Sequence, residues 1–545
     1  MIPSICTFLV LALGQQEVPS PPAAIVVRPA AWADALRDWK VYRTGQGHRV
    51  IELDTEMGQA ALHANIVRLV RENEEQRSIN PTISPVGFVV LVGDADRGPK
   101  SKPPLPAWYR PSTALVQFGG DKQLATDNPY GDINGDEIPD LAVGRVPADH
   151  PEAAKQFFAR TMGYEKQTTI GSSRRDVRVV AGVGGFGAIA DAVIEMTTRR
   201  FLTERVPKWA DVSMTYASPN SPFCPDPWHF CESTIDQLNA GSLFWVYVGH
   251  GHVKHLDYLK VGSDFLGILD DSNVAQVRVQ GHRPIAIFLA CYTGAFDAIE
   301  DCLAEQLVMA DNGPVAALAA TRVSGPYGLA ALSSGLLDQC FEKRVGSLGE
   351  VIRNAKQQML VPSDSAPDQA NDAQMEMITA IAAALSPAGY DLLAERQEHV
   401  WQMNLLGDPM LRLNHPSSMN LSANSRITAG EIILAEGTCS HPGKLTVELT
   451  RSRDRTPRDL FVAGQFSSDS IIREKMQTSY GLANNFTLQR QTIELAAAGA
   501  FRCQFPTSIT DSPGRYVVKV FAEGDRSWST ASTDVLVRLP RTPAP

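Results

Sequence analysis

The sequence lacks long apolar runs and any excess of positive charge. Beyond the N-terminal segment, no stretch reaches the ~18 consecutive apolar residues that a membrane-spanning helix needs. Fifty Lys and Arg residues stand against 60 Asp and Glu residues, which gives a formal net charge of −10. Nucleic acids and anionic membranes bind basic surfaces, so the charge argues against both as main partners. An acidic balance is compatible with bound calcium.

Cysteine is also scarce, with eight residues in 545. One of them lies in the apolar N-terminal segment, and the remaining seven are an odd number, so pairing the others would leave one free thiol. Cys224 and Cys231 bracket a short loop and could close it by a disulfide. Cys439 and Cys503 both fall in a β-rich region near the C-terminus. Cys302 and Cys340 could pair or could equally be buried thiols in apolar runs. Cys291 is the residue left over.

Basic residues are missing from the first 27 positions. Residues 5–13 are apolar, and Ala12-Leu13-Gly14 has the small-x-small pattern of a cleavage site. We therefore predict a signal peptide over residues 1–14, followed by a polar, Pro-rich linker over residues 15–23. The expected location is outside the cytoplasm, either secreted or in the cell envelope.

The length excludes a single core, because domains usually contain ~100–200 residues. Residues 24–168 alternate short strands with helices, and the pattern restarts in residues 169–416. This alternation predicts an α/β fold with a parallel sheet in two subdomains. Residues 417–540 alternate polar and apolar positions between turns, which predicts a small β-sandwich. Residues 541–545 are expected to form a disordered tail.

Two apolar strand patterns end in residues that can carry chemistry. The run 243–248 (LFWVYV) stops at Gly249-His250-Gly251, and the run 285–289 (IAIFL) stops at Ala290-Cys291. Ligands bind beyond the carboxyl ends of the strands in open parallel sheets, so we expect His250 and Cys291 at one edge. Imidazole can activate a thiol as its base. The backbone amides of Gly251 and Cys291 could form an oxyanion hole.

Four motifs in this order resemble the gingipain family of cysteine peptidases, family C25. They are VGHG at 248–251, LACYTGAF at 289–296, NLLGDPML at 404–411 and IPDLAVGR at 138–145. The resemblance implies a caspase-like α/β fold, peptide-bond hydrolysis through a thioester, polypeptide substrates and a trailing immunoglobulin-like domain. That C-terminal domain is expected to contact a surface or another protein.

The resemblance also implies roles for single residues. His250 and Cys291 carry over as general base and nucleophile. The family's acidic residue that steadies the histidine falls at Asp140, whose side chain is shorter than the family's Glu. Tyr327 is a candidate wall of the substrate pocket. The carboxylate that Arg-specific members use is replaced by Ala153, so cleavage after Arg is not supported.

A second cluster of polar residues lies at 127–140. Asp132, Asn134 and Asp136 occupy alternate positions of a DINGDEIPD segment, and Asp127 precedes it. Oxygen ligands at this spacing resemble a calcium loop, although the glycine position and the absence of a closing Glu exclude an EF-hand. We therefore expect Ca²⁺ at these four residues, and no organic cofactor. If Asp140 also binds the metal, it is not free to steady His250.

Three other functions are compatible with parts of the sequence. Residues 182–187 (GVGGFG) fit the dinucleotide pattern G-x-G-x-x-G, but no convincing acidic residue follows. His250, His252 and His255, with Asp257 nearby, could bind a metal in a hydrolase of another class. A secreted binding protein on an inactive peptidase scaffold is the non-enzymatic alternative. The intact His250 and Cys291 pair favours the cysteine endopeptidase.

Overall fold

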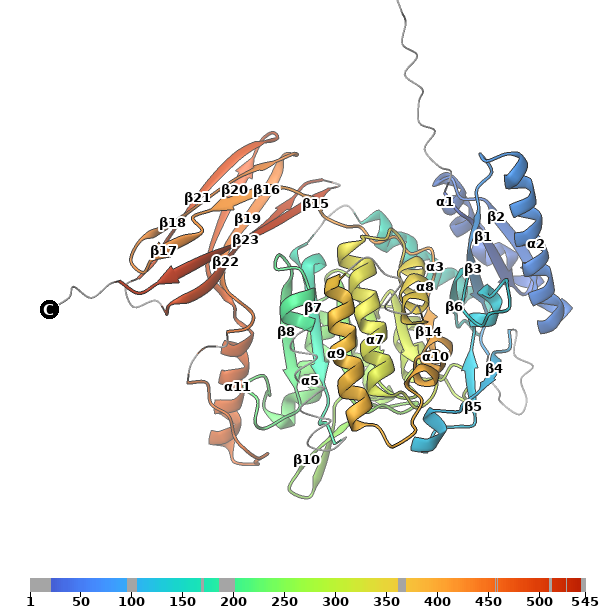
Figure 1. Cartoon of the computed structure of the whole chain (residues 1–545), viewed down its shortest axis with the longest axis horizontal. Helices are drawn as coiled ribbons and strands as arrows, with labels where there is room; N and C mark the ends of the chain where they lie inside the picture. The colour runs from blue at the N-terminus through green and yellow to red at the C-terminus, as the bar shows by residue number, and fades with distance from the viewer. Residues whose placement is uncertain are drawn as a thin grey trace, which may run out of the picture.

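The computed structural model describes residues 21–95, 105–167, 171–185, 201–360, 369–455, 457, 459–508, 512–525 and 527–540 (Figure 1). The expected signal peptide, most of the linker and the C-terminal tail lie outside the described residues. No helix in the described part of the chain is long and apolar enough to cross a membrane.

In the described part of the N-terminal region, the chain forms six strands and three α-helices. They are β1 (Ala23–Arg28), α1 (Arg37–Gly45), β2 (Val50–Asp54), α2 (Gln59–Ile79), β3 (Val86–Val92), β4 (Trp108–Pro111), β5 (Gln123–Thr126), β6 (Ala142–Val146) and α3 (Pro151–Lys166).

The second region carries the two motif strands among its elements. They are β7 (Asp176–Ala181), β8 (Asp211–Tyr216), α5 (Phe230–Asn239), β9 (Phe244–Val248), β10 (Tyr258–Val261), β11 (Asp264–Gly267), β12 (Ile285–Leu289), α6 (Leu303–Met309), β13 (Ala316–Ala320), α7 (Pro326–Leu337), α8 (Leu348–Leu360), α9 (Gln369–Leu385), α10 (Leu392–Gln402) and β14 (Met403–Leu406).

Ten strands from both regions form one continuous sheet in the order β2-β1-β3-β6-β14-β13-β12-β9-β7-β8. Neighbours are parallel except for β13 and β14, which are antiparallel. The strands on either side of that pair therefore run in opposite directions. The prediction of a mostly parallel α/β sheet in two subdomains is confirmed, with the two subdomains joined edge to edge through β6 and β14.

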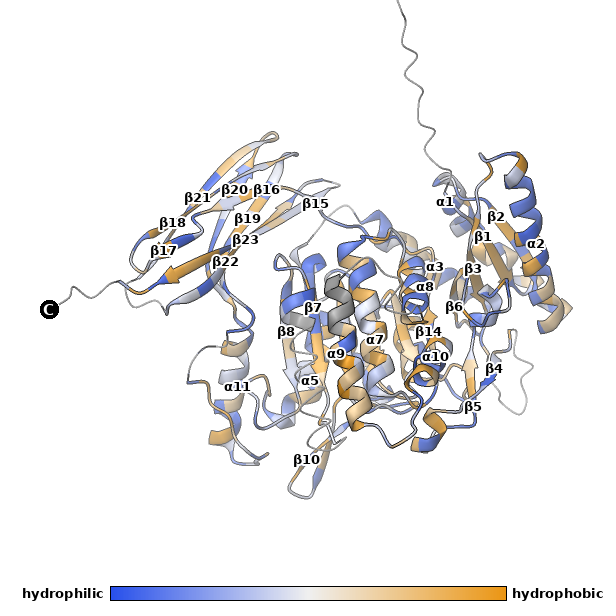
Figure 2. Ribbon diagram, in the orientation of Figure 1, coloured by the Kyte–Doolittle hydropathy of each residue, from blue (hydrophilic) through white to orange (hydrophobic). Residues whose placement is uncertain are grey.

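The central strands are apolar on both faces because helices cover both faces. Trp245 and Phe288 belong to a core cluster shared with α5 and α6. Phe244 and Ile285, the alternate residues of the same strands, pack in a second cluster with α7 and α8. In Figure 1, α7 and α9 lie in front of the sheet. Figure 2 colours β1 and β3 as hydrophobic, whereas the outer helix α2 is largely hydrophilic.

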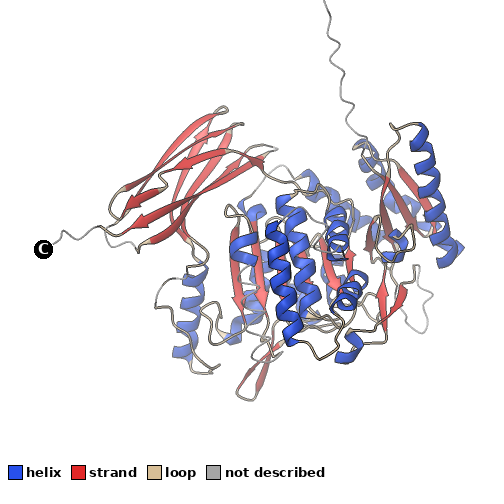
Figure 3. Cartoon of the chain, in the orientation of Figure 1, coloured by secondary structure: helices blue, strands red, loops and turns tan. Residues whose placement is uncertain are grey.

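The C-terminal region forms a sandwich of two sheets that is separate from the central sheet (Figure 3). One sheet has the order β15-β23-β22-β19-β20 with β17 added, and the other is β16-β18-β21. The bounds are β15 (Ser417–Ser418), β16 (Asn420–Ala423), β17 (Arg426–Thr428), β18 (Ile432–Cys439), β19 (Gly443–Arg451), α11 (Ser470–Asn484), β20 (Thr487–Leu495), β21 (Gly499–Pro506), β22 (Gly514–Glu523) and β23 (Trp528–Arg538). The predicted β-sandwich is therefore present.

Buried charges attach the sandwich to the central sheet. Arg175, just before β7, lies 2.9 Å from Glu448 on β19 and 2.9 Å from Asp211 on β8. Lys519 on β22 pairs with the same Asp211. The inserted helix α11 covers the edge strand β8, where the Asn484 side chain accepts a hydrogen bond from the Met214 amide over 2.8 Å.

The cysteine pairings that the sequence suggested are not formed. All seven cysteines among the described residues are free thiols. Cys439 lies opposite Gly499 in the β18–β21 ladder and Cys503 lies opposite Ala435, so the two sulfurs are displaced along the strands. The Cys231 thiol contacts the Asn273 side chain instead of Cys224.

Candidate functional site

The two motif strands are neighbours in the sheet. β9 and β12 pair in parallel, with Val248 opposite Leu289. His250 and Cys291 each follow two residues later, so both lie beyond the same edge of the same strand pair. Gly251 packs against the second loop: a Cβ placed there would lie 2.7 Å from the Cys291 carbonyl oxygen. The structure therefore brings His250, Gly251 and Cys291 together, as expected from the sequence.

The Cys291 thiol is contacted by the loop that follows β13. The backbone amide of Ser324 donates a hydrogen bond to the sulfur over 3.2 Å. Burial raises the pKa of the Cys291 thiol, and the Ser324 amide opposes this rise only in part. Because desolvation disfavours the charged form, the resting side chain is a neutral thiol. A nearby base is needed to make it nucleophilic.

The His250 peptide is held from both sides. The Tyr247 hydroxyl donates to the His250 carbonyl oxygen over 2.8 Å. The His250 amide donates to a carboxylate oxygen of Asp257 over 3.2 Å. The sequence indicated Asp257 only as a possible metal ligand. Its contact with His250 depends on the chain folding back after β9, for which a single sequence carries no direct signal.

Two backbone amides near the thiol are available to a substrate. In the part of the chain that the structure describes, neither the Gly251 nor the Cys291 amide donates to a backbone carbonyl. Tyr292 has a left-handed backbone conformation, with φ of 57°, which turns the chain sharply after Cys291. An oxyanion hole needs such unoccupied donors at fixed positions.

The structure does not bring Asp140 to His250, which corrects the role implied by the resemblance. Asp140 precedes β6, whereas His250 follows β9, and β14, β13 and β12 lie between those strands. Four strand spacings of about 4.8 Å separate the two positions. The Asp140 carboxylate instead accepts hydrogen bonds from the Ile133 and Asn134 amides of its own turn.

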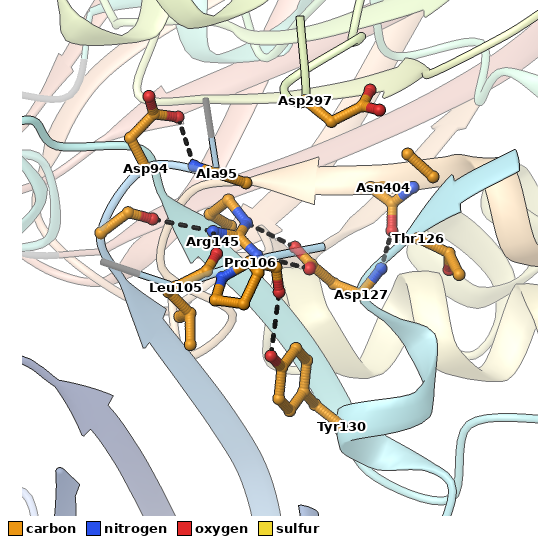
Figure 4. Close-up of polar contacts among 12 residues, drawn as sticks. Asp94, Ala95, Leu105, Pro106, Thr126, Asp127, Tyr130, Arg145, Asp297 and Asn404 are labelled. Atoms are coloured by element: carbon orange, nitrogen blue, oxygen red, sulfur yellow. Dashed lines mark hydrogen bonds and ion pairs between the residues drawn. The ribbon is translucent and has the colours of Figure 1, made fainter. Parts of the chain in front are cut away.

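Asp127 is used by a buried ion pair and not by a metal loop, a second correction. Its two carboxylate oxygens lie 2.7 and 2.6 Å from nitrogens of Arg145 (Figure 4). The same guanidinium donates to the carbonyl oxygens of Gly93 and Leu105. Arg145 also lies 4.8 Å from the ring centroid of Phe296, in the loop after Cys291. Asp127 therefore holds the Arg145 guanidinium, which in turn contacts Phe296 of the second subdomain.

The remaining calcium candidates share one turn. The Asn134 side-chain amide lies 3.0 Å from an Asp136 carboxylate oxygen and 3.4 Å from an Asp140 oxygen. Asp132 accepts hydrogen bonds from the Gly135 and Glu137 amides. Carboxylate and amide oxygens are the donors that Ca²⁺ prefers. Among the described residues, however, the carboxylates of Asp132, Asp136 and Asp140 do not gather closely enough to form a metal-binding group, so calcium in this turn stays a prediction.

Tyr327 packs inside the helical layer. Its side chain is buried at the start of α7, and its hydroxyl lies 3.1 Å from the Thr379 hydroxyl on α9. The preceding loop is fixed by α10, because the Gly325 amide donates to His399 over 3.1 Å. It is Ser324, and not Tyr327, that contacts the Cys291 thiol among the described residues. A place for Tyr327 in the wall of the substrate pocket therefore stays a prediction.

Hydrogen bonds and an ion pair between charged and aromatic side chains connect the loops around Cys291. Arg322 lies 2.6 Å from Asp297, which also accepts a hydrogen bond from the Tyr109 hydroxyl over 2.9 Å. The Tyr292 hydroxyl lies 3.1 Å from Asp121. These residues come from both subdomains, so the network closes the site across their junction. Their spacing in the sequence gave no sign of it.

His250, His252 and His255 offered an alternative metal site, but they do not form a metal-binding group among the described residues. The His252 and His255 rings stack with centroids 4.4 Å apart. The one potential metal-binding group found among the described residues consists of Asp94, Asp149 and Asp301. Glu305 is buried close to this group. Its burial raises the pKa of its carboxyl, and the nearby negative charge of Asp94 raises this pKa further. Hard oxygen donors of this kind would suit Ca²⁺ and not a catalytic zinc.

The glycines of the dinucleotide-like segment have a structural explanation, although the last of them, Gly187, lies outside the described residues. A Cβ on Gly182 would lie 2.3 Å from the Asp257 carboxylate and 2.8 Å from the Tyr247 hydroxyl. This position therefore requires glycine for packing beside the β9 loop. A nucleotide is not needed to account for it.

Comparisons with known proteins agree with this geometry. The model of peptidase family C25 matches residues 17–414. The Arg-specific cysteine proteinase gingipain R is similar at 18% identity and a TM-score of 0.51, covering 96% of this chain and 99% of that chain.

A complex of gingipain pro- and mature domains from Porphyromonas gingivalis has the same identity and TM-score, with 95% of this chain and 100% of that chain covered. A further structure, described only as a protease, has 14% identity, a TM-score of 0.55 and coverage of 95% and 98%. No curated protein matches. At such low identity these structures show the fold alone, a gingipain-like, caspase-like α/β fold. The family match covers most of the sequence, and the chain therefore belongs to peptidase family C25.

Proposed function

We propose that this chain is a secreted cysteine endopeptidase in which Cys291 is the nucleophile and His250 the general base. The single observation that supports the proposal is the parallel pairing of Val248 with Leu289, because His250 and Cys291 each follow this pair by two residues. Membership of family C25 supports a cysteine peptidase that acts on polypeptides. The family and the predicted signal peptide support a location outside the cytoplasm.

The proposed reaction begins from a neutral thiol. When a peptide binds, His250 takes the thiol proton and the Cys291 sulfur attacks the carbonyl carbon. The carbonyl oxygen becomes an oxyanion, which the Gly251 and Cys291 amides stabilise by hydrogen bonds. His250 then gives its proton to the leaving nitrogen, the C–N bond breaks, and a thioester remains.

Water completes the cycle. His250 removes a proton from a water molecule, whose oxygen attacks the thioester carbonyl. The second tetrahedral intermediate uses the same two amides. The C–S bond breaks, the carboxylic acid product leaves, and the sulfur regains its proton from His250. No group outside the chain is required for the proton transfers.

We also propose a structural calcium ion in the 132–140 turn, bound by Asp132, Asn134, Asp136 and Asp140. The ion would fix the turn that precedes β6. It lies several strands from the thiol, so its effect is expected on stability and not on the chemical step.

Hydrolysis of a mixture of fluorogenic peptides tests the proposed function. Cys291→Ala and His250→Ala should each abolish measurable hydrolysis, while Cys231→Ala, at another partly exposed thiol, should retain it. The proposal fails if a well-folded Cys291→Ala variant still hydrolyses peptides at the wild-type rate.

A further inference from the structure

A half-buried carboxylate lies against the backbone of the proposed base. Asp257 follows the turn after β9, and its Oδ2 atom accepts hydrogen bonds from the His250 amide over 3.2 Å and the Val183 amide over 3.3 Å. The first amide belongs to the loop after β9 and the second to the loop after β7. One oxygen thus ties together two loops at the edge of the sheet where Cys291 lies.

Close packing fixes the position of this oxygen. Gly182 leaves room for it, since a Cβ there would approach Oδ2 to 2.3 Å. The Tyr247 hydroxyl lies 3.4 Å from the same oxygen and also donates to the His250 carbonyl. Two hydrogen bonds therefore hold the His250 backbone, one from its amide to Asp257 and one to its carbonyl oxygen from Tyr247.

The charge of Asp257 acts on the same histidine. Burial raises the pKa of the Asp257 carboxyl, whereas the positive charge of His250 and the backbone hydrogen bonds oppose that rise. Attraction between the two groups is mutual, so an ionised Asp257 stabilises the imidazolium that forms when His250 takes the thiol proton.

The other titratable groups around this pair come from three places. They are Tyr247 on β9, His252 in the same loop as His250, and Cys291 beyond β12, whose charge reaches the Tyr247 hydroxyl. Tyr247 remains neutral because burial raises its pKa well above the ordinary value. Burial also lowers the pKa of His252. Asp257 is thus the carboxylate in contact with the His250 peptide.

We propose that Asp257 is the positioning residue of His250, in the role that the resemblance had implied for Asp140. It holds the His250 backbone through the amide contact and favours the protonated imidazole during proton transfer. This inference rests on the proposed peptidase function. It adds a residue from the loop after β9, only seven positions beyond the histidine that it serves.

Asp257→Asn in the full-length protein tests the proposal, because the amide keeps the shape and removes the charge. The value of kcat/KM should fall on the order of 10- to 100-fold, a part of the ~10²–10⁴-fold that general acid–base catalysis contributes. The acidic limb of the pH profile of kcat/KM should also move to lower pH, because the imidazolium loses its stabilising charge. Asp264→Asn, at an exposed position on β11, is the matched control and should change neither.

A second variant reaches the same carboxylate from the neighbouring loop. Gly182→Ala places a methyl group where Oδ2 lies, so it should reproduce the lower kcat/KM and the displaced acidic limb. If Asp257→Asn does not fold, Gly182→Ala tests the same proposal in its place. Wild-type kcat/KM and an unchanged acidic limb in a folded variant at either position would overturn the role of Asp257. Full activity of Cys291→Ala would instead overturn the peptidase function itself, so the two failures are distinguishable.

Discussion

Val248 on β9 and Leu289 on β12 face each other directly in a parallel ladder. Paired strands lie about 4.8 Å apart, so the loops that follow this pair start from neighbouring points. His250 and Cys291 each come two residues after it, and Gly251 packs on the Cys291 backbone. Sheet register thus brings the two loops that carry the proposed catalytic residues to one place.

Replacing Gly251 by Ala should impair catalysis more than folding. The new Cβ would meet the Cys291 carbonyl oxygen at 2.7 Å, so the loop must shift and the Gly251 amide must leave its position. Loss of one oxyanion donor costs about 10²–10³-fold in kcat. Steady-state kinetics measure the loss, and Gly163→Ala on α3 is the control because nothing lies within 4 Å of its added methyl. Unchanged kcat in Gly251→Ala would exclude this amide from the oxyanion hole.

Alkylation of Cys291 by iodoacetamide should depend steeply on pH. Burial raises the pKa of this thiol, so its thiolate fraction should increase tenfold per pH unit throughout the neutral range. Peptide mapping by mass spectrometry separates the reaction from that of Cys231, where burial raises the pKa to about 11. If the alkylation rate of Cys291 instead no longer changes with pH below pH 7, the thiolate is already formed there. The proposed general-base step would then be wrong.

Asp127→Ala should destabilise the whole fold. The change leaves the fully buried Arg145 guanidinium without its counter-charge, which costs about 3–5 kcal/mol. Urea unfolding measures the loss. The exposed pair Asp34 and Arg37 provides the comparison, because Asp34→Ala should stay within about 0.5 kcal/mol. Equal stability of both variants would contradict the role of Asp127 as the counter-charge of buried Arg145.

Calcium should raise the melting temperature of the wild-type chain relative to a chelator-treated sample. At a free concentration 100 times Kd the stabilisation would be about 2.7 kcal/mol. Asp136→Ala should remove the shift, because it deletes one carboxylate of the 132–140 turn. No shift in the wild type would eliminate the calcium proposal. A shift that persists in Asp136→Ala would move the ion to another site, such as the group formed by Asp94, Asp149 and Asp301.

The sequence predicted the features that depend on local pattern. Buried parallel strands are continuous apolar runs, as in β3, whose seven residues are all buried, and the candidate site residues follow such runs at their carboxyl ends. His250 and Cys291 could therefore be proposed from strand ends together with the motifs that resemble family C25. The period-two alternation of β19 likewise identified the C-terminal sandwich.

Features that depend on pairing between distant segments could not be predicted in the same way. Asp127 is close in sequence to a calcium-like loop, but both of its carboxylate oxygens accept hydrogen bonds from buried Arg145. Asp140 was separated from His250 only when the strand order was known. The contact of Ser324 with the thiol, and that of Asp257 with His250, arise from how loops after different strands fold together.

Covalent labelling with a peptidyl electrophile tests the central claim most directly. The reagent should modify wild-type protein once, and mapping of the adduct should place it on the Cys291 sulfur, with labelling lost in His250→Ala. Modification of Cys302 or Cys340 while Cys291 stays free would contradict the account.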